Sequence, residues 1–246
     1  MSNGFYTAAQ AMMMQQRRLN TISNNIANVK TNGYKKEETI FSSFQESLNY
    51  RIDEQGKTLI GSTSKLSAID EINFRFDLAN LEDTNRSLDI ALVSEGFYTV
   101  KQNNQIFYTR DGSFNIDSEG YLITSNGARV QGNKGDIRVV DDKFVVNETG
   151  VVRNSNGQVI DTLLIQTPND STNLIKMGNG YFSLDGGTLD KTTPWVIQSM
   201  LEHSNVDVTE EMSQLIQVQR NFQSVANALK TIDGLNARAV SEIGKV

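Results

Sequence analysis

The chain has no cysteine among its 246 residues and a single histidine, His203. Without cysteine there are no disulfides, thiolate nucleophiles or sulfur-ligated metals. One histidine leaves no His-based acid–base pair and none of the usual zinc sites. The sequence also contains no dinucleotide fingerprint, no G-x-S-x-G and no Ser-His-Asp set. We therefore expect no catalytic residue, no metal, no cofactor and no enzymatic activity.

The chain also lacks long apolar runs and an excess of positive charge. No run approaches eighteen apolar residues, so we expect no direct insertion into a membrane. The formal charge of −6 argues against a nucleic-acid partner. Residues 1–36 nevertheless carry +5 and no acid, which leaves −11 for the remainder. Mitochondrial transit peptides are also basic and acid-free, but they favour Ser and Arg, whereas this segment is rich in Asn, Gln and Met. The segment also lacks the continuous apolar region of a secretory signal peptide.

Apolar residues recur at heptad spacing at both ends of the chain. Such spacing builds an apolar seam along one helix face, which has to be covered by another helix. The predicted helices run from Phe5 to about Lys30, with Gly33 as a stop, and from after Asp207 to about Ile243. The predicted assembly seam consists of Phe5, Met12, Leu19, Ile22, Ile26, Val29, Leu215, Val218, Phe222, Val225, Leu229, Ile232 and Ile243.

Between the two ends the apolar period changes from seven to two. Turn dipeptides such as Asn126-Gly127 and Asn156-Gly157 separate short β-rich runs, which is typical of antiparallel hairpins. The predicted fold class is α+β and multi-domain, with the terminal helices pairing as a coiled coil around a central all-β domain of hairpins. The predicted domains are residues 1–36 with 204–246 (helical assembly domain), 37–80 (extended connector) and 81–203 (all-β domain).

Two further groups of residues are weak candidates for sites. The run Asn115 to Gly120 imitates the start of a calcium loop, but Asn126 stands where that loop needs a bidentate Glu. Aromatic side chains on a β domain can line a carbohydrate site, although they more often pack in the core. The aromatic candidates are Trp195, Tyr98, Tyr108 and Tyr121.

Several distinctive sequence blocks are spread along the chain. The first is Ser23-Asn-Asn-Ile-Ala-Asn-Val-Lys-Thr-Asn-Gly-Tyr-Lys-Lys36. Others are Arg86 to Leu92, Gly96 to Tyr98, Tyr108 to Phe114 and Ser204 to Met212. In sequence and in order these blocks resemble those of the bacterial flagellar rod and hook proteins. Ile26 and Lys30 depart from the residues common there. The signature residues are Asn24, Asn25, Ala27, Asn28, Gly33, Tyr34, Ser204, Asn205 and Val206.

The resemblance implies a structural subunit of the flagellar basal-body rod that polymerises helically into an axial drive shaft and export channel. The implied partners are further copies of the chain, other rod and hook proteins, and the flagellar type III export apparatus. The implied location is the basal body, reached by export into the cell envelope. The length resembles proximal or distal rod proteins. A hook protein of the same family, or a glycan-binding or peptidoglycan-active β domain with oligomerising helices, remains the alternative.

Overall fold

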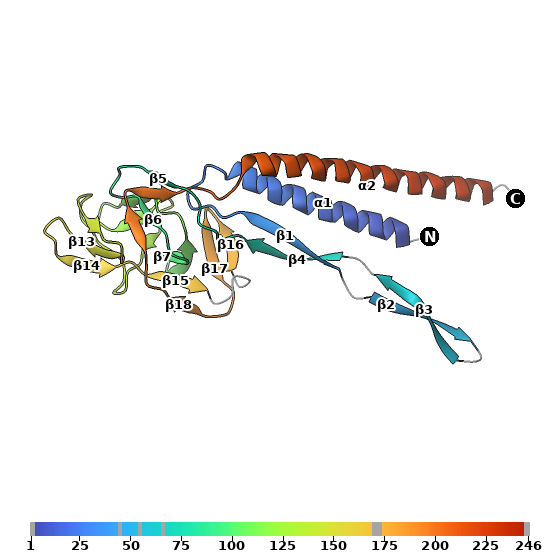
Figure 1. Cartoon of the computed structure of the whole chain (residues 1–246), viewed down its shortest axis with the longest axis horizontal. Coiled ribbons are helices and arrows are strands. Elements are labelled where there is room, and N and C mark those ends of the chain that lie inside the picture. Colours follow the sequence, from blue (N-terminus) through green and yellow to red (C-terminus); the bar gives the residue numbers. More distant parts are fainter. Residues whose placement is uncertain (1–2, 44–45, 54–55, 65–66, 169–173, 244–246) are drawn as a thin grey trace. The chain divides into compact units, whose positions relative to one another are not determined.

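The computed structural model describes residues 3–43, 46–53, 56–64, 67–168 and 174–243. It combines two terminal helices with a β-rich centre, an α+β fold (Figure 1). The chain forms two compact units. Unit 1 contains residues 1–26, 37–73 and 208–246, and unit 2 contains residues 27–36 and 74–207. Among the described residues, no helix combines the length and the apolar character needed to cross a bilayer.

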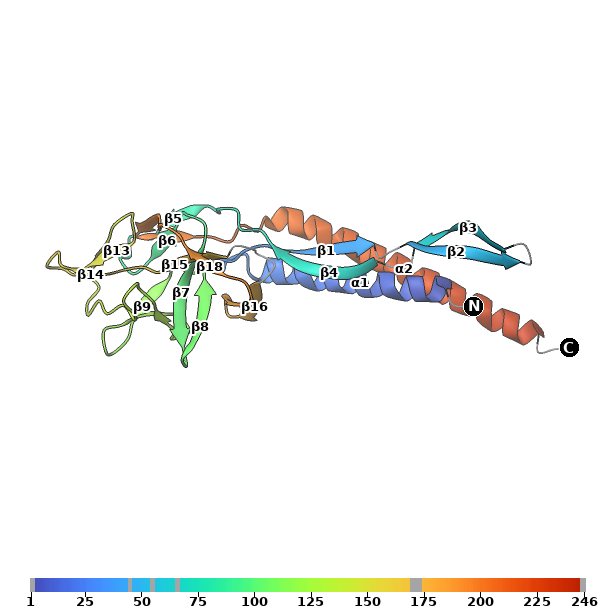
Figure 2. The same cartoon turned by 90° about the horizontal axis from the view of Figure 1, so that it is seen from below.

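Unit 1 holds both helices and four strands, which form two separate pairs. In Figure 1 and Figure 2 the helices run alongside each other, and the end of α1 meets the start of α2. β1 pairs with β4, and β2 pairs with β3 as an antiparallel hairpin. We expected an extended connector in this region, whereas the structure forms paired strands. The elements are α1 (Asn3–Ala27), β1 (Glu37–Ser43), β2 (Glu46–Asp53), β3 (Gly56–Ser64), β4 (Ser67–Phe74) and α2 (Val208–Ile243).

The predicted helix bounds are met at two ends out of four. α1 begins at Asn3, two residues before the predicted Phe5. α2 begins directly after Asp207 and ends at Ile243, as predicted. α1 ends at Ala27, three residues before the predicted Lys30. The chain turns there because Thr31 donates from its amide to the Asn28 carbonyl at 3.0 Å and from its hydroxyl to the Asn28 side-chain oxygen at 3.3 Å. Such local side-chain bonds compete with a continuing helix.

Unit 2 contains a nine-stranded sheet and three smaller ones. The main path of the large sheet runs β16-β17-β8-β7-β11-β10-β9, with β15 pairing β7 and β18. The smaller sheets are β12-β13-β14, β19-β6 and β20-β5. The strands are β5 (Leu81–Asp83), β6 (Ile90–Leu92), β7 (Phe97–Gln102), β8 (Gln105–Thr109), β9 (Phe114–Ile116), β10 (Leu122–Thr124), β11 (Arg129–Val130), β12 (Val145–Val146), β13 (Val151–Arg153), β14 (Val159–Thr162), β15 (Ile165–Pro168), β16 (Leu174–Gly178), β17 (Tyr181–Leu184), β18 (Leu189–Lys191), β19 (Val196–Gln198) and β20 (Met200–Glu202).

Turn chemistry explains much of this strand order. Asn126-Gly127 joins β10 to β11, and Asn156-Gly157 joins β13 to β14, with both glycines at positive φ. One turn carries no such dipeptide: Asn103 and Asn104, at φ 49° and 66°, join β7 to β8. Asparagine tolerates the left-handed region well enough to replace glycine there.

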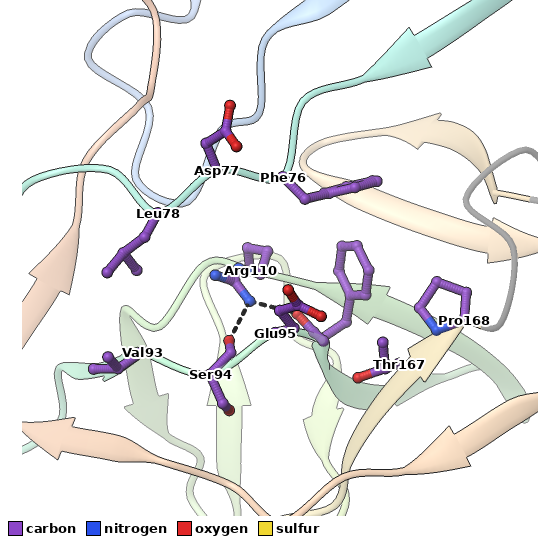
Figure 3. Close-up of a pocket in the computed structure, with 11 residues that line it drawn as sticks. Phe76, Asp77, Leu78, Val93, Ser94, Glu95, Arg110, Thr167 and Pro168 are labelled. Atoms are coloured by element: carbon purple, nitrogen blue, oxygen red, sulfur yellow. Dashed lines mark hydrogen bonds between the residues drawn. The ribbon is translucent and has the colours of Figure 1, made fainter.

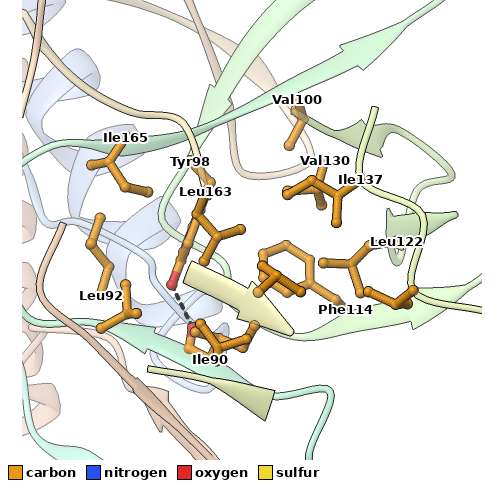
Figure 4. Close-up of a cluster of buried hydrophobic side chains, with 14 of the residues drawn as sticks. Ile90, Leu92, Tyr98, Val100, Phe114, Leu122, Val130, Ile137, Leu163 and Ile165 are labelled. Carbon is orange, nitrogen blue, oxygen red and sulfur yellow. Dashed lines mark hydrogen bonds between the residues drawn. The ribbon is translucent and has the colours of Figure 1, made fainter. Parts of the chain in front are cut away.

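The core of unit 2 lies between these sheets (Figure 4). Tyr98 and Phe114 are fully buried and meet edge to face, with ring centroids 5.2 Å apart. The hydroxyl of Tyr98 donates to the Ile90 carbonyl at 2.7 Å, so its one polar group is satisfied. Burial raises the pKa of Tyr98 far above its usual range. A second cluster gathers Phe74, Phe97, Tyr108, Leu174 and Phe182.

Candidate assembly site at the helix roots

Two short segments lead from unit 2 into the helices, and we call them the roots. The root of α1 is residues 27–36, and the root of α2 is residues 202–207. The roots bond to each other within unit 2. The amide of Gly33 donates to the Glu202 carbonyl at 2.8 Å, and the amide of Lys36 donates to the Asn205 side-chain oxygen at 2.7 Å. The side-chain amide of Asn205 also donates to the Arg75 carbonyl at 2.8 Å.

A buried ion cluster of Lys35, Arg110 and Glu202 lies at the roots. Lys35 Nζ is 2.6 Å from Glu202 Oε1, and Arg110 Nε is 3.2 Å from Glu202 Oε2. The three side chains are at most 3% exposed. Each carboxylate oxygen therefore faces a different cation. Removing one partner of such a buried set typically costs about 3–5 kcal/mol, because a charge is left uncompensated.

Backbone groups complete the ion cluster. Lys35 Nζ also donates to the Asp77 carbonyl at 2.8 Å, and Arg110 donates to the carbonyls of Ser94 at 2.8 Å and Gly96 at 2.7 Å. Burial lowers the pKa of Lys35, and the nearby Arg110 charge lowers it further, against the opposing effect of Glu202. The cations are thus fixed by several acceptors each, which gives the cluster one preferred geometry.

Arg110 also contributes to the wall of a pocket of about 600 Å³ (Figure 3). Its walls mix polar and apolar side chains in nearly equal measure, and the lining residues Asp77 and Glu95 are exposed. Because Arg110 is bonded to Glu202 and to two carbonyls, its guanidinium is already committed to the protein. The lining residues are Phe76, Asp77, Leu78, Val93, Ser94, Glu95, Gly96, Phe97, Arg110, Thr167 and Pro168.

Gly33 is required by the close approach of the roots to Arg110. Its φ is +65°, a region that favours glycine. A Cβ on Gly33 would lie 2.6 Å from the amide nitrogen of Asp111 and closer still to the Arg110 carbonyl. Gly33 is not the residue that ends α1, because the helix already ends at Ala27; its role here is to let two backbones approach closely.

The other signature residues lie around the roots, with different degrees of burial. Tyr34 is buried, and the ammonium of Lys176 lies 4.3 Å from its ring centroid. Val206 is buried, and its amide donates to the Ser204 hydroxyl at 3.3 Å. Ala27 and Asn24 are exposed. The signature thus marks a structural junction rather than a cluster of reactive groups.

In unit 1, Asn25 ties the end of α1 to β1 and to α2. Its side-chain amide donates to the Glu37 carbonyl at 3.0 Å and to Glu211 Oε2 at 3.1 Å, while the Glu37 amide donates to Asn25 Oδ1 at 3.0 Å. Asn25 and Glu211 are each 1% exposed. The hydroxyls of Thr21 and Thr39 add a second link between α1 and β1 at 2.9 Å.

The predicted seam is only partly covered. Ile22 and Val218 are buried, whereas Phe5 is 41% exposed. The side chain of Ile243 lies outside the described residues. Val29 lies in the root of α1, beyond the helix. The half-buried seam residues are Met12, Leu19, Ile26, Val29, Leu215, Phe222, Val225, Leu229 and Ile232. The seam therefore keeps apolar surface for further contacts along most of its described length.

The weak site candidates do not assemble into sites. Tyr98 and Tyr108 belong to separate core clusters, while Trp195 is exposed. Arg129 lies 4.1 Å from the ring centroid of Tyr121 and bonds Asp117 and Glu119, the acids of the calcium-like run. No group of metal-ligating side chains gathers in the part of the chain that the structure describes.

Sequence reasoning missed the ion cluster and Glu211. Lys35 and Arg110 lie inside the blocks that carry the family resemblance, but consecutive charges such as Lys35-Lys36-Glu37 look like a solvated surface. Glu202 lies two residues before the Ser204 block, in a short strand. The available signal was a set of charged residues next to signature residues, and nothing local identified their partners.

Comparisons with known proteins agree on one family. Three family models match: Flagella basal body rod protein over residues 5–35, Flagellar hook protein FlgE/F/G D1 domain over residues 91–184, and Flagellar basal body rod FlgEFG protein C-terminal over residues 197–242. The chain is 30% identical to the flagellar basal-body rod protein FlgF of Caulobacter vibrioides, with both chains covered completely. It is 29% identical to the flagellar hook-basal body complex protein FlhO of Bacillus subtilis over the whole of both chains. It is 30% identical to FlgG of Bacillus subtilis, over 95% of this chain and 96% of that one.

Proposed function

The chain belongs to the flagellar basal-body rod FlgE/F/G family and is a structural subunit of the basal-body rod, and from this premise we propose that it assembles through its two terminal helices. In this proposal α1 and α2 pair as a coiled coil. Copies of the chain then repeat by a screw operation, which yields an open tube rather than a closed ring. The neighbours are other rod and hook proteins, and the chain acts without catalysis.

One observation carries this proposal: most of the apolar seam is only partly buried in the single chain. Apolar surface aligned on one helix face is stabilising when it is covered, at roughly 25 cal/mol per Å². Seam residues such as Leu229 and Phe222 lie on α2 and retain uncovered area. Neighbouring subunits would cover this surface, so folding of the helices and polymerisation are coupled.

Two further parts of the proposal concern the route and the domains. The chain is exported by the flagellar type III apparatus, with its helices unpaired, and folds at the growing end. The domain division is set by the roots rather than by residues 36 and 203, because residues 27–36 and 203–207 bond within unit 2. The predicted division, with boundaries at 36/37, 80/81 and 203/204, places residues 27–36 and 204–207 in the helical domain.

A pair of α2 variants tests the assembly proposal. We expect Leu229→Asp to abolish polymerisation onto purified basal bodies, because it places a charge in the seam that a neighbour must cover. Asn227→Asp adds the same charge on the same helix at an exposed position and serves as the control. Sedimentation and electron microscopy measure assembly, and denaturant unfolding of unit 2 checks the fold. Equal assembly of both variants would contradict the role of the seam.

A further inference from the structure

The two roots are distant in sequence and adjacent in space. Lys35 and Glu202 are 167 residues apart in the chain, yet their charged groups are 2.6 Å apart. The backbones of the two roots are also bonded, because the amide of Gly33 donates to the carbonyl of Glu202. All of these residues belong to unit 2, so the bonds between the roots require only unit 2 to be folded.

We propose that the bonds between the roots, made by the buried ion cluster together with Asn205, decide which helices pair, by holding both roots in unit 2 so that α1 pairs with α2 of the same chain. This rests on the proposed function, because it concerns the step that precedes polymerisation. The roles of Lys35, Arg110 and Glu202 are positioning roles, since none of them lies in the helices.

Chain entropy supplies the reason. Bringing together two segments separated by a long loop has an entropic cost that rises with the logarithm of loop length. Once the roots are joined, the second helix is present at an effective concentration on the order of millimolar. A helix from another copy must compete with that local concentration. Without the joined roots, exchange of helices between copies becomes a low-cost route to swapped oligomers.

The charges of the cluster make the joining specific. A buried ion pair adds little stability over an apolar set, but a misplaced one leaves a charge uncompensated. Glu202 faces a different cation with each oxygen, and its Oε1 also accepts from the Ala79 amide at 3.1 Å. A root that slips by one residue would leave Lys35 or Arg110 without its carboxylate. Only one alignment of the roots satisfies the whole cluster.

Hydrogen exchange on the full-length chain at low concentration tests the order of events. We expect the amides of Gly33 and Lys36 to exchange within about tenfold of the amides of β7, and those of α1 to exchange about a hundredfold faster or more. Root amides that exchange as fast as those of α1 would overturn the proposal.

Two variants separate root positioning from general stability. Asn205→Ala removes the bonds to the Lys36 amide and the Arg75 carbonyl without burying an unpaired charge, and Glu202→Gln removes the carboxylate at nearly constant shape. Glu95→Gln, at an exposed site in the same unit, is the control. We expect both root variants to lose protection at Gly33 and Lys36 while β7 keeps it. Should Glu202→Gln unfold unit 2 entirely, Asn205→Ala decides the outcome.

Refolding at increasing protein concentration measures helix exchange directly. Light scattering after size exclusion should show the original chain and Glu95→Gln as monomers. Dimers of Asn205→Ala should appear at a concentration about tenfold lower, because its root is held less tightly. Equal dimer fractions in all variants would overturn the proposal. Failure of the original chain to polymerise onto basal bodies would instead contradict the proposed function, while the measurements on the roots would still stand.

Discussion

The two units of the molecule bury their apolar side chains to very different degrees. In unit 2, Val100, Phe114 and Leu122 are completely buried in one continuous core. In unit 1, among the helix side chains that the structure describes, Ile22 and Val218 are the buried apolar ones, while Leu235 is 61% exposed. Unit 2 therefore has a core that is closed within one chain, whereas the seam of unit 1 keeps apolar surface that is partly exposed.

Both units also bury polar and charged side chains. Unit 2 encloses the charged set Lys35, Arg110 and Glu202, and unit 1 encloses Asn25 and Glu211 at the junction of its helices. These two sets lie where the terminal segments meet, although unit 2 also buries other polar side chains among its strands, such as Thr124 and Asp161. Alignment of the two ends is thus determined by directional bonds, and the remaining seam is left to non-directional apolar contact.

The largest expected effect comes from the core of unit 2. Phe114→Ala should lower the free energy of unfolding by about 3–5 kcal/mol, because a fully buried ring that packs against Tyr98 is lost. Val240→Ala, at a 64% exposed site in α2, should change it by less than about 0.5 kcal/mol. Denaturant titration of the full-length chain measures both. Similar losses for the two variants would remove the contrast between the units.

The next effect isolates the close approach at Gly33. Gly33→Ala should cost more than the roughly 1–3 kcal/mol of a strained left-handed residue, because its Cβ would overlap the Arg110 backbone. Gly157→Ala is the matched control, since its φ is +77° and nothing lies within 4 Å of the added Cβ. Thermal unfolding of unit 2 gives the difference between the two. Equal costs would mean that strain alone explains the glycine.

A smaller effect is expected from Asn25, and it should appear in polymerisation rather than in the stability of unit 2. Asn25→Ala removes the bonds to Glu37 and Glu211 and leaves buried groups with fewer partners, at about 1–3 kcal/mol. The critical concentration for polymerisation should rise about tenfold for every 1.4 kcal/mol lost. Ser23→Ala, at an exposed position two residues earlier on α1, should leave that concentration nearly unchanged. A loss of unit 2 stability in Asn25→Ala would contradict the separation of the units.

The smallest effect is a pH dependence that belongs to unit 2. Burial and the charge of Arg110 hold the pKa of Lys35 below its ordinary 10.5. Between the folded and unfolded pKa values the unfolded chain binds more protons, so stability rises with pH up to about 10.5 and then levels off. The free energy of unfolding, measured relative to Lys35→Met, should therefore increase across this range. If the free energy of unfolding instead decreased with pH, the charge of Glu202 would have the largest effect on the pKa of Lys35 and would raise it.

The sequence predicts elements whose signals are local. α2 begins after Asp207, where a residue type common at helix N-termini directly precedes the apolar period. The Asn126-Gly127 and Asn156-Gly157 turns form as predicted, since Gly at positive φ fits a tight hairpin. These features depend on residues within a few positions of one another.

The remaining features depend on residues that are far apart in the chain. Lys35, Lys36 and Glu37 form a charged run, yet all three are buried. Their burial requires partners such as Glu202, which no local pattern identifies. The strands β1 to β4 were missed for a related reason, because the Gly and Ser residues among them suggested a connector. The turn between β7 and β8, at Asn103-Asn104, was missed because it lacks the glycine by which tight hairpin turns are usually recognised.

The bonds between the roots also define how the molecule carries mechanical load. A pull on the two ends of the chain reaches Gly33 and Glu202, which are bonded directly to each other. The force therefore crosses between the ends at the roots and bypasses the strands between them. The β-rich part of unit 2 is mechanically shielded until those bonds break. Under tension, this arrangement lets the load pass between the two terminal segments while the strands between Gly33 and Glu202 remain unstrained.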